Sequence, residues 1–204
     1  GWTTSPHTWG AEGDYRWFAQ PRASQDALGQ VMMFGGKLSE DSDTSCAIDG
    51  ESSTEDGYCD YGHSKTWLWD GTDWAEAVIE GASPPFYEEM HMAYDSHRGK
   101  VIVTGRPYSG PSGNGEMWEW DGVAWSQVAG SGPDFSSFSS YNIAYDRSRQ
   151  ALVYHNGQSR QTWEWDGGWS LKYDYNNSGS DNEYSVPRTQ YSAMGYDPVS
   201  ERVV

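Results

Sequence analysis

The sequence predicts an all-β fold, a β-propeller of four-stranded antiparallel blades, and three observations lead to this prediction. Two short motifs recur in fixed register at a spacing of about fifty residues, as in propeller blades. The chain of 204 residues contains 12 Trp, 14 Tyr and 24 Gly, a composition that favours short strands joined by tight turns. No stretch keeps an apolar period of 3.6 residues or approaches the roughly twenty apolar residues of a membrane span. We therefore expect one domain over residues 1–204.

The first motif is Trp-x-Trp-Asp-Gly, which occurs at 67–71, 118–122 and 163–167 and is followed closely by Trp74, Trp125 or Trp169. Asp-Gly between alternating apolar positions is a strong hairpin signal, because tight hairpin turns need positive φ. We expect Trp-x-Trp to form the third strand, C, of each unit, and the next Trp to open the fourth, D. Alternation places the first Trp of each motif on one side of the sheet and the following residue on the other. The tryptophans should therefore pack between blades.

The second motif is Tyr-Asp, at 94–95, 145–146 and 196–197, with the first aliphatic residue six positions after each Asp. A degenerate copy runs from Ala23-Ser24-Gln25 to Val31 at the same offset. We expect strand A to end at Tyr-Asp and strand B to be the aliphatic run, which suits burial on both faces. The predicted repeats are approximately 20–79, 88–128, 140–173 and a partial unit at 190–204, preceded by an N-terminal strand at 1–5.

This frame gives about three and a half blades, in the strand order D-ABCD-ABCD-ABCD-AB, and indicates part of a larger propeller. The alternative is a four-bladed ring, with strand C at Thr8-Trp9 and strand D from Tyr15 to Ala19. That alternative leaves only 14 positions from Trp17 to Val31, whereas 27 separate the equivalent Trp74 and Val101. The partial-chain interpretation is preferred.

These repeats resemble the kelch family, specifically its secreted bacterial type with Trp-x-Trp-Asp-Gly-x-x-Trp blades; galactose oxidase is a propeller relative. The paired glycines of the family stand at Gly35-Gly36, whereas the second unit has Gly105-Arg106 and the third Asn156-Gly157. The resemblance implies the propeller fold. It implies no particular activity, because propellers host many functions.

The antiparallel strand order predicts which face of the propeller binds a ligand. A–B and C–D turns lie on one face, and the longer B–C and D–A connections lie on the other. Long connections in a compact domain are often functional, and Tyr beside Asn suits sugar or protein surfaces. The D–A connection between the second and third units contains Phe135 and Phe138 among serines. The predicted ligand-binding residues are Tyr58, Tyr61, Tyr108, Asn114, Tyr175 and Tyr184.

The insertion at residues 38–64, the longest B–C connection, contains eight acidic residues and no Lys or Arg. It also contains Cys46 and Cys59, whose best interpretation is a loop disulfide and an oxidising compartment. Its alternating acids offer oxygen ligands that suit calcium, namely Asp41, Asp43 and Asp49. Cys46 replaces the sharp-turn glycine and Ser52 the final glutamate of a calcium loop. These departures favour a solvated acidic loop and leave calcium as the alternative.

The net charge of −17 excludes nucleic acid and membrane surfaces as partners, because phosphates and anionic lipids would repel the chain. We expect an extracellular or cell-surface recognition or adhesion module, not an enzyme, that binds a protein or glycan. The ligand would be cationic, calcium-bridged, or a neutral glycan. A structural, self-assembling subunit is the second interpretation. A galactose-oxidase-like or lyase-like enzyme is the third, since no nucleophile motif or histidine ligand spacing supports it.

Overall fold

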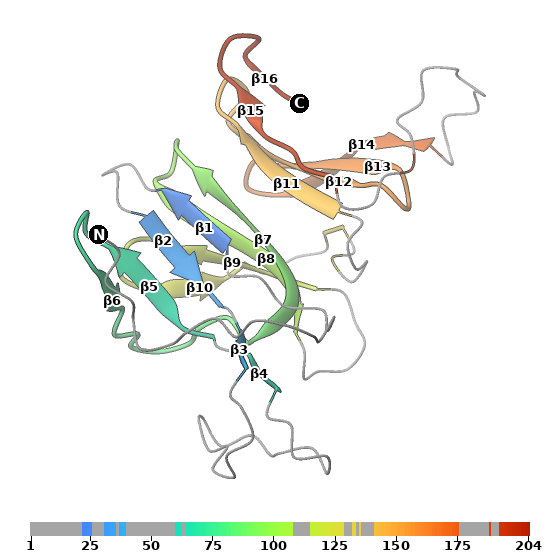
Figure 1. The fold of residues 1–204 in the computed structure, drawn as a ribbon. Coiled ribbons are helices and arrows are strands. Elements are labelled where there is room, and N and C mark those ends of the chain that lie inside the picture. Colours follow the sequence, from blue (N-terminus) through green and yellow to red (C-terminus); the bar gives the residue numbers. More distant parts are fainter. Residues whose placement is uncertain are drawn as a thin grey trace.

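A computed structural model describes the part of the chain that contains the repeats (Figure 1). The described residues are 22–25, 31–35, 37–39, 60–62, 64–107, 115–128, 132–133, 135, 141–175, 188 and 192–204. Strands are the regular elements of these ranges. No helix within them is long and apolar enough to cross a membrane.

Three four-stranded antiparallel sheets and two short pairs of strands make up the fold. The first sheet contains β1 (Arg22–Gln25), β2 (Val31–Phe34), β5 (Thr66–Trp69) and β6 (Trp74–Glu76). The second contains β7 (Tyr87–Asp95), β8 (Lys100–Pro107), β9 (Glu116–Trp120) and β10 (Trp125–Gln127). The third contains β11 (Tyr141–Asp146), β12 (Ala151–Asn156), β13 (Gln161–Trp165) and β14 (Trp169–Asp174). The short pairs are β15 (Tyr196–Asp197) with β16 (Arg202–Val203), and β3 (Lys37–Ser39) with β4 (Asp60–Gly62).

The sheets are successive blades, which confirms the predicted fold class. Each follows the order A-B-C-D in space as in sequence, and β15 and β16 supply the A and B strands of a further unit. The first strands lie side by side, because β7 contacts β1 on one side and β11 on the other (Figure 1). The proposed N-terminal strand at 1–5 lies outside the described residues.

The first two blades pack face to face through the tryptophans of the second. Phe34 of β2 belongs to one buried cluster with Trp118, Trp120 and Trp125. The rings of Phe34 and Trp125 meet edge to face with centroids 5.2 Å apart. Trp125 Nε1 also donates a hydrogen bond to Thr66 Oγ1 of the first blade at 2.9 Å, which satisfies an indole N–H that burial would otherwise leave unpaired.

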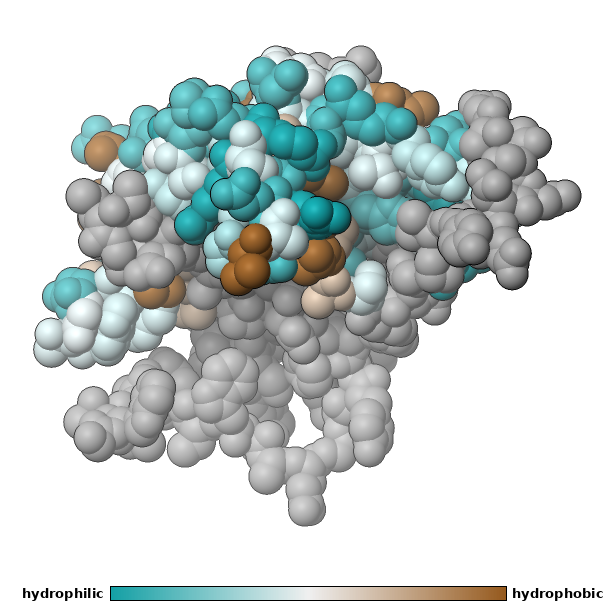
Figure 2. Space-filling view, turned by 90° about the horizontal axis from the view of Figure 1, so that it is seen from above, coloured by the Kyte–Doolittle hydropathy of each residue, from teal (hydrophilic) through white to brown (hydrophobic). Residues whose placement is uncertain are grey.

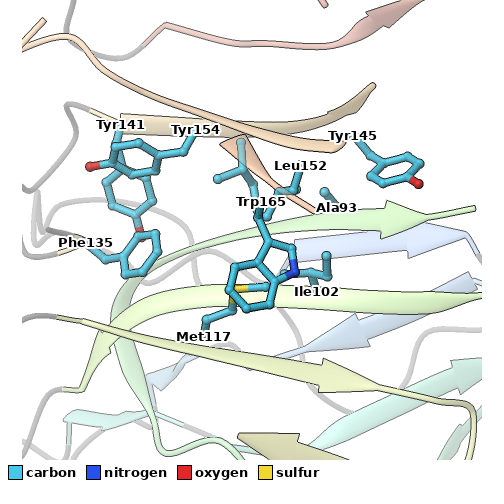
Figure 3. Packing of buried hydrophobic residues seen from close by; sticks show 10 residues of the cluster. Ala93, Ile102, Met117, Phe135, Tyr141, Tyr145, Leu152, Tyr154 and Trp165 are labelled. Atoms are coloured by element: carbon cyan, nitrogen blue, oxygen red, sulfur yellow. The ribbon is translucent and has the colours of Figure 1, made fainter. Parts of the chain in front are cut away.

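The second and third blades repeat this contact on the other side of the second sheet. Trp165 reaches from β13 toward Ile102 and Met117 of the second blade (Figure 3). Beside it, Phe135 meets the ring of Tyr154 edge to face at 5.4 Å, and Tyr154 stacks on Tyr141. Phe135 is only 5% exposed. The structure therefore assigns this residue of a D–A connection to the core, and it is not part of an exposed aromatic surface.

In the first two blades the Asp of the Trp-x-Trp-Asp-Gly motif organises the C–D turn. The carboxylate of Asp70 accepts the backbone N–H groups of Thr72 and Asp73, at 2.7 and 2.9 Å. Asp121 does the same in the second blade. These backbone hydrogen bonds hold the pKa of Asp70 and the pKa of Asp121 below their ordinary values. The glycine that follows adopts φ between 101° and 106° in all three blades, as the motif predicts.

The Asp that ends strand A organises the A–B turn in the same way. Asp95 accepts the N–H groups of His97 and Arg98, both at 3.0 Å, and Asp146 holds the corresponding turn of the third blade. Burial raises the pKa of Asp95, but hydrogen bonds from Arg98 more than offset this effect, so its pKa lies below the ordinary value. The Tyr-Asp motif therefore marks a capped turn.

A carboxylate on strand C, buried in the second blade and half-buried in the third, extends these turns into an ion network. Glu119 is 5% exposed and pairs with Arg98 at 2.6 Å and Lys100 at 2.8 Å. In the third blade Glu164 pairs with Arg149 and Lys172. The first blade has Leu68 at this position, packed against the apolar cluster. The residue between the two tryptophans thus lies opposite them, as predicted, and carries either a network or an apolar contact.

We expect Trp125→Ala to lower the free energy of unfolding by about 3–5 kcal/mol, because it empties a buried site between two blades. Trp74 occupies the equivalent position in the first blade, since Trp69 pairs with Trp74 as Trp120 pairs with Trp125. Trp74 is 36% exposed whereas Trp125 is 6% exposed, so Trp74→Ala should cost clearly less. Urea unfolding of both variants measures the difference, and equal losses would contradict the blade packing described above.

The last position of the A–B turn offers a second prediction, because Gly99, Gln150 and Glu201 share it with φ of 69°, 54° and 53°. Left-handed backbone costs a non-glycine residue roughly 1–2 kcal/mol, partly offset by the greater freedom of glycine in the unfolded chain. Gln150→Gly should therefore raise the free energy of unfolding by about 0.5–1 kcal/mol, and Gly99→Ala should lower it by a similar amount. Chemical unfolding of this reciprocal pair is the measurement; a loss in both variants would refute the shared turn geometry.

Candidate functional site

The antiparallel order of every blade places the A–B and C–D turns at one end of the strands and the B–C and D–A connections at the other. We call the second end the long-loop face. It includes the insertion between β2 and β5, the segment between β8 and β9, and the segment between β14 and β15. The third blade differs, because its B–C connection is the four-residue turn 157–160. The long-loop face therefore has one short connection beside longer ones. We call the position of this short turn, residues 157–160, the low corner.

The acidic insertion begins as a two-stranded ladder, which the sequence did not predict. Lys37, Leu38 and Ser39 of β3 pair with Gly62, Tyr61 and Asp60 of β4. The ladder extends away from the first blade at the lower edge of Figure 1. The insertion is therefore anchored by backbone hydrogen bonds at its base, and Tyr61 occupies a strand of that base.

Most of the residues predicted from sequence to bind a ligand lie outside the described part of the chain. Tyr61 is described only as a member of β4, and Tyr175 is described with its side chain directly after β14. Outside the description lie Tyr58, Tyr108, Asn114 and Tyr184, the acids Asp41, Asp43 and Asp49, and the cysteines Cys46 and Cys59. These assignments stay predictions. Within the described residues, no group of three or more His, Cys, Asp or Glu could hold a metal ion.

The low corner of the long-loop face brings Tyr175 against an arginine. Asn156 ends β12, and its side-chain oxygen accepts the N–H groups of Gln158 and Ser159 at 2.9 and 3.0 Å. This cap closes the turn, and Arg160 completes it with φ of 55°. The Arg160 guanidinium carbon lies 3.9 Å from the centre of the Tyr175 ring. The Tyr175 N–H also donates to the Arg160 carbonyl at 3.4 Å, so backbone and side chains both join the two residues.

His155 of β12 and Thr162 of β13 lie next to the turn 157–160. His155 Nδ1 is 3.0 Å from Thr162 Oγ1, on the directly paired positions of β12 and β13. Burial lowers the pKa of His155, which favours the neutral imidazole at physiological pH. Asn142, the partner of His155 on β11, donates from Nδ2 to Ser192 Oγ at 2.8 Å. His155 therefore belongs to a polar row within the third blade.

The second blade carries a buried phenol near the same face. Tyr87 donates to Glu116 Oε2 at 3.4 Å, and Trp118 Nε1 donates to the same oxygen at 2.9 Å. Burial, and then the negative charge of Glu116, raise the pKa of Tyr87, so this phenol stays protonated. Gly115 precedes the strand because a Cβ there would lie 2.5 Å from both the Gly105 carbonyl oxygen and Phe135 Cβ. Tyr87 is fully buried, and its role here is structural.

The face that carries the short turns is largely hydrophilic. Figure 2 views the molecule from the top of Figure 1, the end at which the β7–β8 and β15–β16 turns lie. In this view the hydrophobic residues form separate spots among polar ones. The interior tryptophans are not available at this surface, because Trp118, Trp120, Trp125 and Trp165 are 4–8% exposed. The stacked pair of Arg160 and Tyr175 lies on the other face, the long-loop face.

Sequence reasoning selected Tyr175 and missed Arg160, its partner. The missed signal is the short B–C connection of the third unit, which follows Asn156 and begins with Gly157. The other two units have long connections there. A capped four-residue turn places its last residue close to strand D, and in this chain that residue is an arginine. Comparison of the chain with protein-family models finds no match, and comparison with curated proteins finds none either. The fold is therefore supported by the repeats and by the sheet topology.

Proposed function

We propose that this protein is a kelch-type propeller that acts as a secreted or cell-surface recognition module and binds a protein or glycan through its long-loop face. The observation that carries the proposal is the asymmetry between the two ends of the blades. One end is closed by short turns capped by Asp70, Asp95, Asp121, Asp146 and Asp197. The other end carries connections that differ in every blade. Repeated, capped turns support a scaffold, and variable connections on a rigid scaffold support recognition.

The chemistry of the described residues agrees with binding more than with catalysis. The buried phenol of Tyr87 and the imidazole of His155 are both held in their neutral forms by burial. The tryptophans of the second and third blades are used in packing. What remains at the described part of the long-loop face is an arginine stacked on a tyrosine, a pair of residue types common in binding surfaces.

A structural role in an assembly is the second candidate, and one observation favours it. Trp67 and Trp69 of the first blade are half-buried and Trp74 is 36% exposed, whereas Trp118, Trp120 and Trp125 are 4–6% exposed. The first blade thus presents a tryptophan face of the kind that the later blades bury. Sedimentation of the purified chain at several concentrations tests this candidate: association that Trp74→Ser weakens would support it.

The proposed export can be tested through the two cysteines of the chain. If Cys46 and Cys59 form the loop disulfide that we predict, neither will react with a thiol reagent in the unfolded, unreduced protein. Both should react after reduction, and the reduced protein should unfold at lower denaturant concentration, because closing a loop of this size stabilises by about 3 kcal/mol in the chain-entropy model. Two reactive thiols before reduction would count against an oxidising compartment.

Removal of the insertion tests the binding face. Ser39 and Asp60 are paired at the end of the β3–β4 ladder, so residues 40–59 can be replaced by Asn-Gly, which closes a two-residue hairpin. Because the blades do not need this loop, the thermal midpoint should change little, while binding on a glycan and protein array should fall by at least roughly tenfold, as expected when a central contact is lost.

The matched control for this deletion is Val123→Ser, a change at a residue that is 76% exposed in a C–D turn on the opposite face. It should leave array binding intact. Loss of binding in the Val123 variant, together with full binding by the deletion variant, would place the site on the short-turn face and reject the proposal.

A further inference from the structure

We propose that Arg160 and Tyr175 form a subsite for the carboxylate of an acidic sugar, such as a uronic acid residue of a glycan. This inference rests on the proposed function and names the ligand class of one corner of the long-loop face. It differs from the neutral or cationic ligand that the acidic insertion suggests. The two residues come from the B–C turn and the end of strand D of the same blade, and their separation of 3.9 Å defines a compact pair.

Arg160 is placed differently from the basic residues that form ion pairs in the blades. Ion pairs with carboxylates hold the basic side chains of several blade positions: Lys65 with Glu76, Arg98 and Lys100 with Glu119, Arg149 and Lys172 with Glu164. In the described part of the chain, Arg160 makes no ion pair of this kind and lies over an aromatic ring instead. Its Nε is buried and has no hydrogen-bond partner. Arg160 as a whole is only half-buried, so a ligand carboxylate would pair with the part of the guanidinium that stays accessible.

The backbone at Arg160 is strained. Its φ of 55° is left-handed, a region that favours glycine and strains an arginine. The turn does not need a long side chain, since the Asn156 cap and the ladder between β12 and β13 already close it. Gln150 and Glu201 share this φ in the A–B turns, but at Arg160 the strain coincides with an unpaired guanidinium nitrogen, a combination that points to a ligand site. The arginine therefore occupies a position at which folding alone would favour glycine.

The side chains at this corner favour the carboxylate of a sugar as the ligand. A guanidinium is a planar fork that matches a carboxylate, and stacking on Tyr175 fixes its plane in advance. Tyr173 and Tyr175, both half-buried at the end of β14, add amphipathic rings of the kind that contact sugars. The net charge of −17 disfavours dense polyanions such as nucleic acid. Screening beyond about 8 Å at physiological ionic strength still permits an isolated carboxylate to bind next to one arginine.

The test compares oligogalacturonate with the uncharged galactose oligosaccharide of the same length, by titration calorimetry on the full chain. We expect the wild-type protein to prefer the uronate. Arg160→Gly should weaken uronate binding by roughly 10–100-fold, the range of a lost charged hydrogen bond, with a thermal midpoint that is unchanged or higher. Arg160→Lys should lose part of the affinity, because an ammonium lacks the fork. Tyr175→Ala should weaken binding by releasing the guanidinium.

The matched control is Arg147→Gln, which removes an exposed arginine from the A–B turn of the same blade and should leave uronate binding unchanged. Equal affinity for the two oligosaccharides, or full uronate binding by Arg160→Gly, would overturn the inference. Binding of an acidic peptide through Arg160 without uronate binding would overturn the sugar class. In each of these cases the array result with the insertion-deleted protein still decides the proposed function separately.

Discussion

The second and third blades of this protein each bury a tryptophan face by packing it on the opposite face of the preceding blade. A single four-stranded sheet cannot bury its own tryptophans. It has two faces, and each face is covered only where another blade packs against it. Trp125 shows the consequence, since its ring packs on Phe34 and its indole N–H bonds to Thr66, both in the preceding blade. The stability of the second blade therefore depends on the first, and that of the third on the second, as in other repeat proteins whose units contact only their neighbours.

This dependence assigns different tasks to the two ends of the strands. The capped turns at Asp95 and Asp146 fix where strands A and B meet. Arg98 and Arg149 pair with these two carboxylates and also with a glutamate of strand C in the same blade. Ser148 Oγ donates to the Glu201 carbonyl of the following unit at 2.9 Å, so these turns also link neighbouring units. On the long-loop face the Asn156 cap closes the described turn 157–160, and this turn places Arg160 there.

Charge is distributed in the same way. A protein with 30 acidic and 13 basic residues places cations where buried carboxylates need them, as at Glu119, which is paired with both Arg98 and Lys100. Removing one partner of such a pair would leave an uncompensated buried charge. A blade that lacks the Arg is therefore expected to lack the Glu as well. The first blade has Leu28 and Leu68 where the second has Arg98 and Glu119, and Leu68 packs in an apolar cluster.

The sequence by itself determined the strands of the blades, their order and the face on which the strand C residues lie, but not the β3–β4 ladder. The period of two on strand C, the Asp-Gly turns and the six-residue offset after Tyr-Asp are local properties, and local backbone preferences suffice to express them. Tertiary structure decided which of the equivalent tryptophans are buried, because burial depends on a neighbouring blade and not on the motif: Trp125 is 6% exposed and Trp74 36%. It also decided that Phe135 packs inside and that Arg160 lies on Tyr175, since both contacts join segments whose separation in sequence carries no periodic signal.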